Sequence, residues 1–362
     1  MALLMWLPVI SQAEVVKQLF ETTLPVLSQD KDIRQAAFEQ GFIEVLVRVS
    51  GSSQTPSHID IKKASRYVQQ YRYLVVEKKP GQLVDPAQPE VKHNLWIRFS
   101  DSKIKSLLKE NSLSIWGAQR PAVLLWLSVT DGRNRYILRD RDISVIKDAV
   151  EKQAKRRGLP IIWPLFDEVD QKQVTYLDIR GQFWEPVIQA SQRYSVDAIA
   201  LCRMNWDGSS WQVDWSLMLD KKSESWRVRA LDIESLMANG IDLATDQVAS
   251  RFAVVDTMSE GELVVLVNGI SNESIYAKVM HYLSSIASIK RVFPAEVDHD
   301  RIRFHIDMSG EKEDLQRVIA LGKILRPDTV TKVNNLLPEN ADQSKAQADI
   351  ADENILIYKF NQ

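Results

Sequence analysis

The amino-acid sequence predicts a multidomain protein of the α+β and α/β classes. We expect a small α+β N-terminal domain, an α/β middle domain with a mixed sheet and a ferredoxin-like C-terminal domain. Three observations support this prediction. The 362 residues exceed what one hydrophobic core usually serves, segments of helical and strand periodicity alternate along the chain, and the last third has the order β-α-β-β-α-β. The expected domains are residues 14–114, 115–258 and 259–362.

The N-terminal domain is expected to pack one long helix on a small sheet. The helix covers residues 30–49, where apolar or small residues recur at steps of four and Gly51 supplies a stop: Ile33, Ala37, Gly41 and Val45. The other expected elements are a short helical piece at 66–68, strands at 70–77 and 95–99, and a helix at 102–113.

The middle domain is expected to contain a parallel pair of strands. Residues 122–129 form a continuous apolar run, as in strands buried on both faces. A helix at 142–157, ended by Gly158, leads to a second apolar run at 159–166, which predicts a right-handed β-α-β crossover. The remaining expected elements are a helix at 178–194, strands at 197–204, 211–219 and 226–231 with a turn at Asp207-Gly208, and a helix at 234–252.

The C-terminal domain is expected to be ferredoxin-like because of its element order. The elements are a strand at 262–267, a helix at 272–287, two strands around a turn at 298–300, a helix at 311–325 and a last strand at 355–360. Apolar and polar residues alternate through 301–308, so one face of that strand should join the core. The polar stretch 334–354 is predicted to be disordered.

The first thirteen residues predict a signal peptide. An apolar run at 2–10 precedes Ser11-Gln12-Ala13, which has the small-x-small pattern of a cleavage site, so the mature chain would begin at Glu14. No basic residue precedes the apolar run, which suggests that the true start lies upstream. The alternative is a buried first strand or helix. No later apolar run has the ~18 residues that span a bilayer, so we expect an exported, periplasmic protein.

Composition and motifs argue against several functional classes. The 46 Lys and Arg nearly balance the 48 Asp and Glu, so nucleic-acid binding is not expected. The sequence has no nucleotide-binding loop, nucleophile elbow or zinc-protease motif, which predicts no catalytic residue and no cofactor. His299 and His305 are expected in a solvated hairpin without metal. Cys202, in an apolar strand, is expected to be a buried and unreactive thiol.

Two aromatic groups are the candidate binding residues. On the strand at 211–219, Trp211 and Trp215 share one face with leucine and valine, and Trp206 precedes the turn. This pattern favours a core packed by the helices at 178–194 and 234–252, and a glycan-binding platform is the alternative. The stretch SRYVQQYRY (65–73) favours a domain or partner interface over a half-buried strand, because Tyr and Arg are enriched at interfaces. The candidate interface residues are Arg66, Tyr67, Tyr71, Arg72, Trp116 and Arg120.

Five stretches carry a resemblance to a known family: SRYVQQYRY, LWIRF (95–99), WGAQRPAVLLWL (116–127), RRGLPI (156–161) and RYSVDAIALCR (193–203). With these stretches the chain resembles the proteobacterial family called domain of unknown function (DUF) 2066. That resemblance implies an exported protein and no known activity. In the layout of its first two domains the chain is also similar to the flagellar assembly protein T group and to the N-terminal domain of the TolB envelope protein, which are non-enzymatic.

Two functional hypotheses remain. The first is a periplasmic, non-catalytic interaction protein that binds one or more envelope proteins. The second is a protein that binds cell-wall glycan or a small ligand, or an unrecognised enzyme, and it depends on the three tryptophans.

Overall fold

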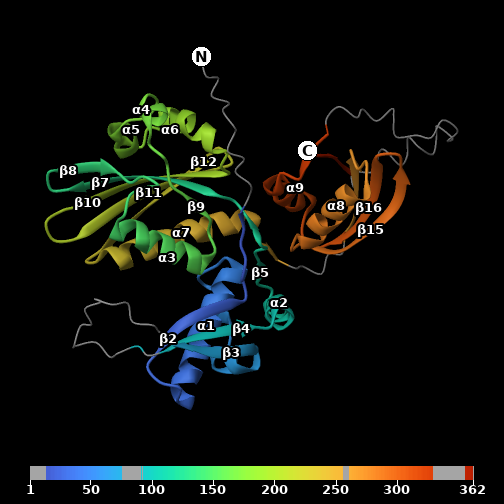
Figure 1. Ribbon diagram of the computed structural model, residues 1–362, viewed down its shortest axis with the longest axis horizontal. Helices are drawn as coiled ribbons and strands as arrows, with labels where there is room; N and C mark the ends of the chain where they lie inside the picture. The colour runs from blue at the N-terminus through green and yellow to red at the C-terminus, as the bar shows by residue number, and fades with distance from the viewer. Residues whose placement is uncertain (1–13, 76–90, 92, 256–260, 329–354, 362) are drawn as a thin grey trace. The chain divides into compact units, whose positions relative to one another are not determined.

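The computed structural model describes residues 14–75, 91, 93–255, 261–328 and 355–361 (Figure 1). The protein is mixed α/β, with several sheets and multiple domains. Its residues divide into two compact units. The first combines residues 1–113 with 120–251, and the second combines residues 114–119 with 252–362. The predicted leader at 1–13 and the predicted disordered stretch at 334–354 lie outside the described residues.

The N-terminal part of the first unit is a three-stranded antiparallel sheet with a helix on one face. The strand order is β2 (Glu21–Val26), β4 (His93–Phe99), β3 (Val68–Val75). The helix α1 (Lys31–Ser50) buries its i+4 face and ends at Gly51, whose φ of 80° is the left-handed conformation expected of a glycine stop. The smaller helices are η1 (Thr55–His58), η2 (Ile61–Arg66) and α2 (Asp101–Glu110). The strand β2 was not predicted, because six residues that include Pro25 give a weak strand signal.

The larger part of the first unit is a six-stranded mixed sheet. Its order is β12 (Lys222–Ala230), β11 (Trp211–Leu219), β10 (Ala198–Trp206), β7 (Val123–Asp131), β8 (Asn134–Ile137), and β9 (Ile161–Ile162) also pairs with β7. Figure 1 shows α3 (Val145–Arg157) and α7 (Ile233–Phe252) on one face of this sheet. The other face carries α4 (Glu168–Gln171), α5 (Tyr176–Gly181) and α6 (Trp184–Ser191), followed by η3 (Gln192–Tyr194).

The predicted parallel pair is confirmed: β7 precedes α3 in the sequence, β9 follows it, and the two strands pair in parallel. One predicted helix beside this sheet was wrong, and one strand of the sheet was missed. The helix expected at 178–194 is interrupted at Gln182, which takes a φ of 55°, so α5 and α6 are separate. The edge strand β8 was not foreseen, because its four residues are too few to show a period.

The second unit contains a five-stranded sheet in the order β15 (Ile289–Asp298), β16 (Arg301–Met308), β14 (Gly261–Asn268), β18 (Ile355–Phe360), β17 (Leu325–Pro327). Its helices are α8 (Glu273–Ser285) and α9 (Lys312–Gly322). The first four strands have the ferredoxin-like neighbour order, but β18 runs parallel to β14 and β17 is an additional edge strand. The ferredoxin-like assignment is therefore not confirmed.

The short strands are β1 (Glu14–Val15), β5 (Ser114–Ile115), β6 (Gln119–Arg120) and β13 (Val254–Val255).

Candidate functional site

The stretch SRYVQQYRY packs mainly on its own domain. Arg66 ends η2, and Tyr67 stacks on Phe42 of α1 with ring centroids 4.9 Å apart. Tyr71 meets the edge of Phe38, also on α1, at 5.3 Å. On the opposite face of β3, the Arg72 guanidinium lies 4.6 Å from the ring centroid of Trp96. Most of β3 nevertheless stays exposed, Tyr71 by 44%, so the interface proposed for Arg66, Tyr67, Tyr71 and Arg72 remains a prediction.

The other two predicted interface residues are buried. Trp116 is 1% exposed and belongs to the second unit, whereas Arg120 is fully buried in the first. Arg120 donates to the carbonyl oxygens of Arg157 at 2.8 Å and Arg48 at 2.7 Å. Burial, followed by the nearby charges of Arg48 and Arg157, lowers the pKa of the Arg120 guanidinium. Arg120 therefore lies at the junction of α1 and the end of α3 within the first unit, which fits a domain interface and not a partner-facing one.

The tryptophan group is not an open platform. Trp215 is 1% exposed, stacks on Trp226 at 5.8 Å and lies against Gly240 of α7. The expected burial is thus confirmed for Trp215. Of the two helical regions expected to pack on it, α7 does so, whereas α5 and α6 lie on the other face of the sheet. Trp206 and Trp211 form a half-buried pair at 5.2 Å beside the turn. Because Trp215 is enclosed, the three tryptophans cannot form the glycan-binding surface that the alternative required.

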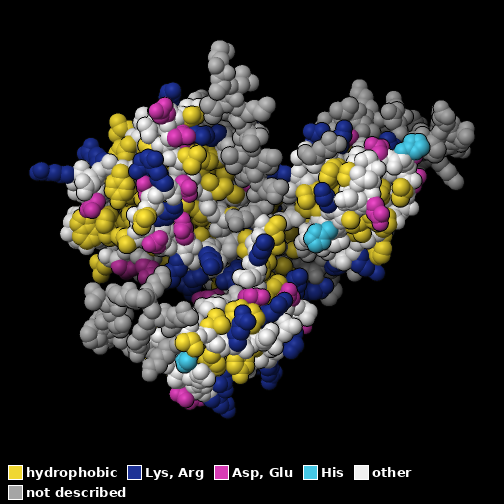
Figure 2. All heavy atoms as spheres, in the orientation of Figure 1, with side chains coloured by type: hydrophobic (Ala, Val, Ile, Leu, Met, Phe, Trp, Pro, Cys, Tyr) yellow, Lys and Arg dark blue, Asp and Glu magenta, His cyan; other side chains and the backbone are white. Residues whose placement is uncertain are grey.

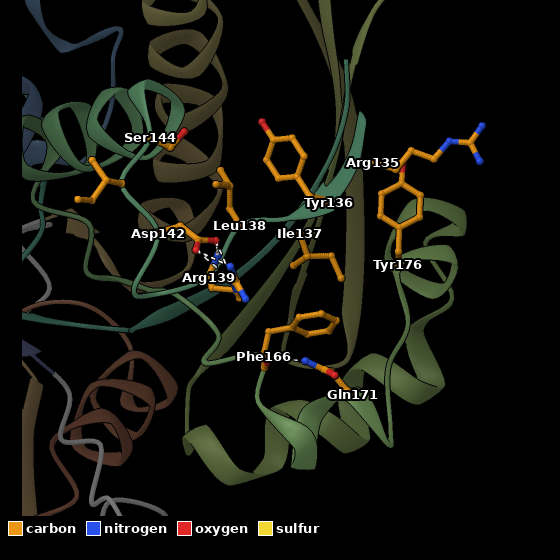
Figure 3. A pocket seen from close by; sticks show the side chains of 11 residues that line it. Arg135, Tyr136, Ile137, Leu138, Arg139, Asp142, Ser144, Phe166, Gln171 and Tyr176 are labelled. Atoms are coloured by element: carbon orange, nitrogen blue, oxygen red, sulfur yellow. Dashed lines mark hydrogen bonds and ion pairs between the residues drawn. The ribbon is translucent and has the colours of Figure 1, made fainter. Parts of the chain in front are cut away.

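The first candidate site is a cleft of about 620 Å³ at the edge of the mixed sheet, which we call the edge cleft (Figure 3). It follows β8 and the loop after it, and Phe166 and Tyr176 close its far side. Figure 3 shows Tyr136 on one side of the strand and Ile137 on the other, the latter facing Phe166. The apolar side chains beside the cleft are exposed: Tyr136 by 40%, Ile143 by 99% and Val145 by 69%. Such exposure next to a strand edge is typical of interaction sites.

The wall of the edge cleft is held in place by a buried carboxylate. Asp170 has no exposed surface and accepts from the backbone N–H of Phe166 at 2.9 Å and from the Tyr194 hydroxyl. Gln171 donates to the Phe166 carbonyl oxygen at 2.9 Å, so the backbone of Phe166 is fixed at a φ of 45°. Burial, and then the bond to Asp170, raise the pKa of Tyr194. The backbone of Phe166 is therefore held in place by side chains of the same unit.

The second candidate site is a cleft of about 600 Å³ on the α5 side of the sheet, which we call the arginine cleft. It is lined by Arg180 from α5, Arg203 from β10 and Arg227 from β12. Between them lies Asp214 of β11, which is 7% exposed and accepts from Arg203 Nε at 2.9 Å and from Arg227 Nε. Burial raises the pKa of the Asp214 carboxyl, but the bonds from Arg227, Arg203 and Gln212 outweigh it and leave that pKa below its ordinary value.

Sequence reasoning missed both clefts. The sequence did not show that Asp214 is enclosed by Arg203 and Arg227. One available signal was the alternation of Arg227 and Arg229 along β12, which places two guanidinium groups on one face. For the edge cleft the signal was Asp131-Gly132, a turn dipeptide in which Gly132 takes a φ of 58°.

Other chemistry finds little support in the described part of the chain. Cys202 is fully buried, and burial raises the pKa of its thiol well above the ordinary value, so it is a poor nucleophile. Over residues 14–75, 93–255, 261–328 and 355–361 there is no cluster of three metal-ligating side chains. His299 lies in the turn after β15, with its side chain 97% exposed, and His305 lies within β16. None of the helices in these ranges is long and apolar enough to span a bilayer.

Comparison with known proteins corrects the family resemblance. Residues 13–117 match a family described as a domain of unknown function (DUF8605), and DUF2066 is not supported. Two of the five stretches used for the resemblance, SRYVQQYRY and LWIRF, lie wholly within the match. They form the paired strands β3 and β4. No curated protein and no solved structure matches the chain significantly. Over residues 13–117, the chain is similar to DUF8605.

Proposed function

We propose that this protein is a non-catalytic interaction protein that takes up an extended segment of a partner along the free edge of β8. The observation that carries the proposal is the edge cleft, where a strand edge lies between exposed apolar side chains. Adding a strand to an exposed sheet edge supplies main-chain hydrogen bonds, and flanking pockets receive alternate side chains of the added segment.

The register of β8 defines which backbone groups are available. Leu138 N–H donates to the Leu127 carbonyl oxygen at 3.0 Å, and Tyr136 pairs with Val129. Because hydrogen-bonded pairs alternate along antiparallel strands, the N–H and C=O groups of Arg135 and Ile137 point away from β7. Within the described residues no other strand pairs with this edge. An extended segment could therefore bond to Arg135 and Ile137 while its side chains contact Tyr136 and Phe166.

The side chains on the surface of the first unit are compatible with strand addition at β8. Figure 2 shows apolar side chains (yellow) among basic side chains (dark blue) on the surface of the first unit. At the cleft itself, Arg139 is already engaged by Asp142 at 2.9 Å, so its charge is largely neutralised. A partner segment with alternating apolar residues fits such a lining better than a charged one.

Arg135→Pro tests strand addition directly. Proline removes an N–H that points away from β7, so β8 should stay in place while the added segment loses a hydrogen bond. A photo-crosslinking residue at Ile143 should capture one specific partner in intact cells, and Arg135→Pro should reduce that adduct at least about fivefold, which corresponds to losing about one hydrogen bond. Arg135→Ala, which keeps the N–H, is the matched control and should retain the adduct.

One result would contradict strand addition: an equal adduct yield from a crosslinker at Leu231, which is 81% exposed and lies away from the edge cleft at the end of β12. An adduct of twice the chain's own mass would instead contradict the choice of occupant, because it would show that a second copy of this chain takes up the edge.

We also propose that the partner is an envelope protein and that this chain is exported. The support is the leader-like pattern at 1–13, and a C-terminal phosphatase fusion that includes the native upstream region should be active outside the cytoplasm. We further propose that the middle domain has a TolB-like layout and that the second unit has a ferredoxin-like origin. The neighbour order β15-β16-β14 supports the second of these.

A further inference from the structure

The guanidinium groups at the arginine cleft are held through Nε, and their terminal nitrogens are available to a ligand. Arg203 and Arg227 each use Nε to bind Asp214, and Arg229 uses Nε to bind the Gln212 side-chain oxygen at 2.9 Å. For these three guanidinium groups, the structure shows no bond from the terminal nitrogens to other described residues. A guanidinium fixed through Nε keeps its two terminal N–H₂ groups in a fixed plane, which is the arrangement that receives an oxyanion.

The fourth guanidinium comes from the helical side of the cleft. Arg180 of α5 donates to Asn205 Oδ1 at 2.7 Å and to Thr130 Oγ1 at 2.9 Å, both through the same nitrogen. The acidic residues Asp178 and Glu185 of these helices do not line the cleft; Asp178 caps α5 through Thr175, and Glu185 accepts from Gln189. Among the residues that line the cleft, three guanidinium groups and the carboxylate of Asp214 leave two positive charges, and Arg229 adds a guanidinium beside the lining residue Gln212.

The rim of the cleft adds an apolar contact. Leu177 is 66% exposed and Phe183 is 59% exposed, and both line the cleft from α5 and the residues after it. An exposed ring beside a cationic site suits the organic part of a ligand, because the ring buries apolar area while the arginines hold the charged group. The volume of about 600 Å³ lies in the range of small-molecule sites.

We propose that the arginine cleft binds a small organic phosphate, with the phosphoryl group on the terminal nitrogens of Arg203 and Arg227 and the organic group against Phe183. A phosphate monoester carries about −1.5 to −2 charges near neutral pH and has three acceptor oxygens. That charge matches the surplus of the cleft better than a carboxylate, which carries one charge and two oxygens. The site is separate from the edge cleft, and neither proposal depends on the other.

Calorimetric titration of the full-length protein in a phosphate-free, low-salt buffer tests the chemistry. Phenyl phosphate should bind at least about tenfold more tightly than benzoate, because the phosphoryl dianion receives more charge-assisted bonds. Inorganic phosphate should bind more weakly than phenyl phosphate, since it lacks the ring. Binding should weaken as sodium chloride is added. Equal affinity for benzoate, or no heat from phenyl phosphate, overturns the proposal.

Two variants locate the site, and one serves as the control. Arg227→Gln should weaken both phosphates about tenfold or more, and its side chain is 54% exposed, so the fold should tolerate the change. Phe183→Ala should weaken phenyl phosphate and leave inorganic phosphate unchanged. Arg141→Gln removes the same charge from an exposed position of the same sheet domain and should change neither. If Arg227→Gln and Arg141→Gln behave alike, the phosphate binds elsewhere and the assignment is wrong.

Discussion

Tyr358 of β18 shows how burial of one side chain couples stability to pH. The residue is 3% exposed in the core of the second unit, and burial raises the pKa of its hydroxyl to about 12. In the same core Tyr282 donates to the Ile319 carbonyl oxygen at 2.8 Å, and burial followed by the nearby Tyr358 raises its pKa as well. Both phenols are therefore kept neutral in the folded state at pH values where an exposed tyrosine ionises.

The second unit should lose stability in alkaline solution. An unfolded tyrosine ionises near pH 10, so above that pH the unfolded state releases a proton that folded Tyr358 retains until about pH 12. The contribution of Tyr358 is fully present below pH 10 and falls by about 2–3 kcal/mol as the pH rises to 12. Urea unfolding followed by circular dichroism from pH 8 to 12 measures this loss.

Tyr358→Phe separates titration of the phenol from general alkaline damage. The phenylalanine variant should show a flatter dependence of the free energy of unfolding on pH, because the titrating hydroxyl is gone. Tyr276→Phe, a partly buried change in the same core, should keep the wild-type slope. If both variants retain the full alkaline loss, ionisation of Tyr358 is not its cause.

Among the secondary-structure elements, α7 depends on a single glycine for its approach to the sheet. A Cβ atom at Gly240 would lie 2.5 Å from Trp215 Cε2 and Nε1, closer than side chains pack. Glycine costs about 1 kcal/mol relative to alanine in a helix interior, so its presence here reflects the contact with Trp215. The helix can lie flat on β11 only where no side chain intervenes.

Gly240→Ala should therefore destabilise the first unit despite its better helix propensity. We expect a loss of about 1–3 kcal/mol in the free energy of unfolding, as for overpacked cores, measured by urea denaturation. Asn239→Ala, one residue earlier and exposed, is the matched control and should be neutral or slightly stabilising. A Gly240→Ala variant as stable as Asn239→Ala would show that α7 can move away from Trp215 at little cost.

Length decides which elements the sequence could predict. The long helices α1 and α7 begin within one residue of their expected starts, because many turns repeat the same period. The strands β8 and β17, of four and three residues, carry no measurable period. The edge cleft depends on β8, for which the turn dipeptide Asp131-Gly132 was a signal but gave no measure of the strand's length. The arginine cleft combines α5, β10 and β12, and only the tertiary fold brings these elements together.

Within the whole molecule, the two sheets of the first unit are joined by what we call the arginine seam: Arg48, Arg120 and Arg157. Arg48 donates to the Glu21 and Arg156 carbonyl oxygens, both at 2.7 Å, and so links β2 to the end of α3. Arg120 requires a glycine at 158, where a Cβ would lie 2.6 Å from its terminal nitrogen and φ is 67°. The sequence showed the separate domains but not this connection, because arginines distant in sequence meet only after both sheets have formed.

Arg157 is the member of the arginine seam with acidic partners. It is 2% exposed, donates to the Gly51 carbonyl oxygen at 2.8 Å and pairs with Asp242 at 2.9 Å and Asp246 at 2.6 Å, both on α7. Asp246 also accepts from the Ser53 hydroxyl at 2.6 Å. The N-terminal sheet and the mixed sheet therefore share polar contacts that neither can satisfy alone, so we expect them to unfold together.

Thermal unfolding should accordingly show two transitions, one for each compact unit. Arg157→Met leaves Asp242 and Asp246 without their guanidinium, which should cost the first unit about 3 kcal/mol and lower its Tm by about 5–10 °C. Among the described tryptophans only Trp116 lies in the second unit, so tryptophan fluorescence follows the first unit and calorimetry follows both. The second transition should not move, and Arg141→Met, at an exposed position, should shift neither. A single calorimetric peak that moves as a whole in Arg157→Met would show instead that the two units unfold as one. Three peaks would show that the arginine seam does not couple the two sheets of the first unit.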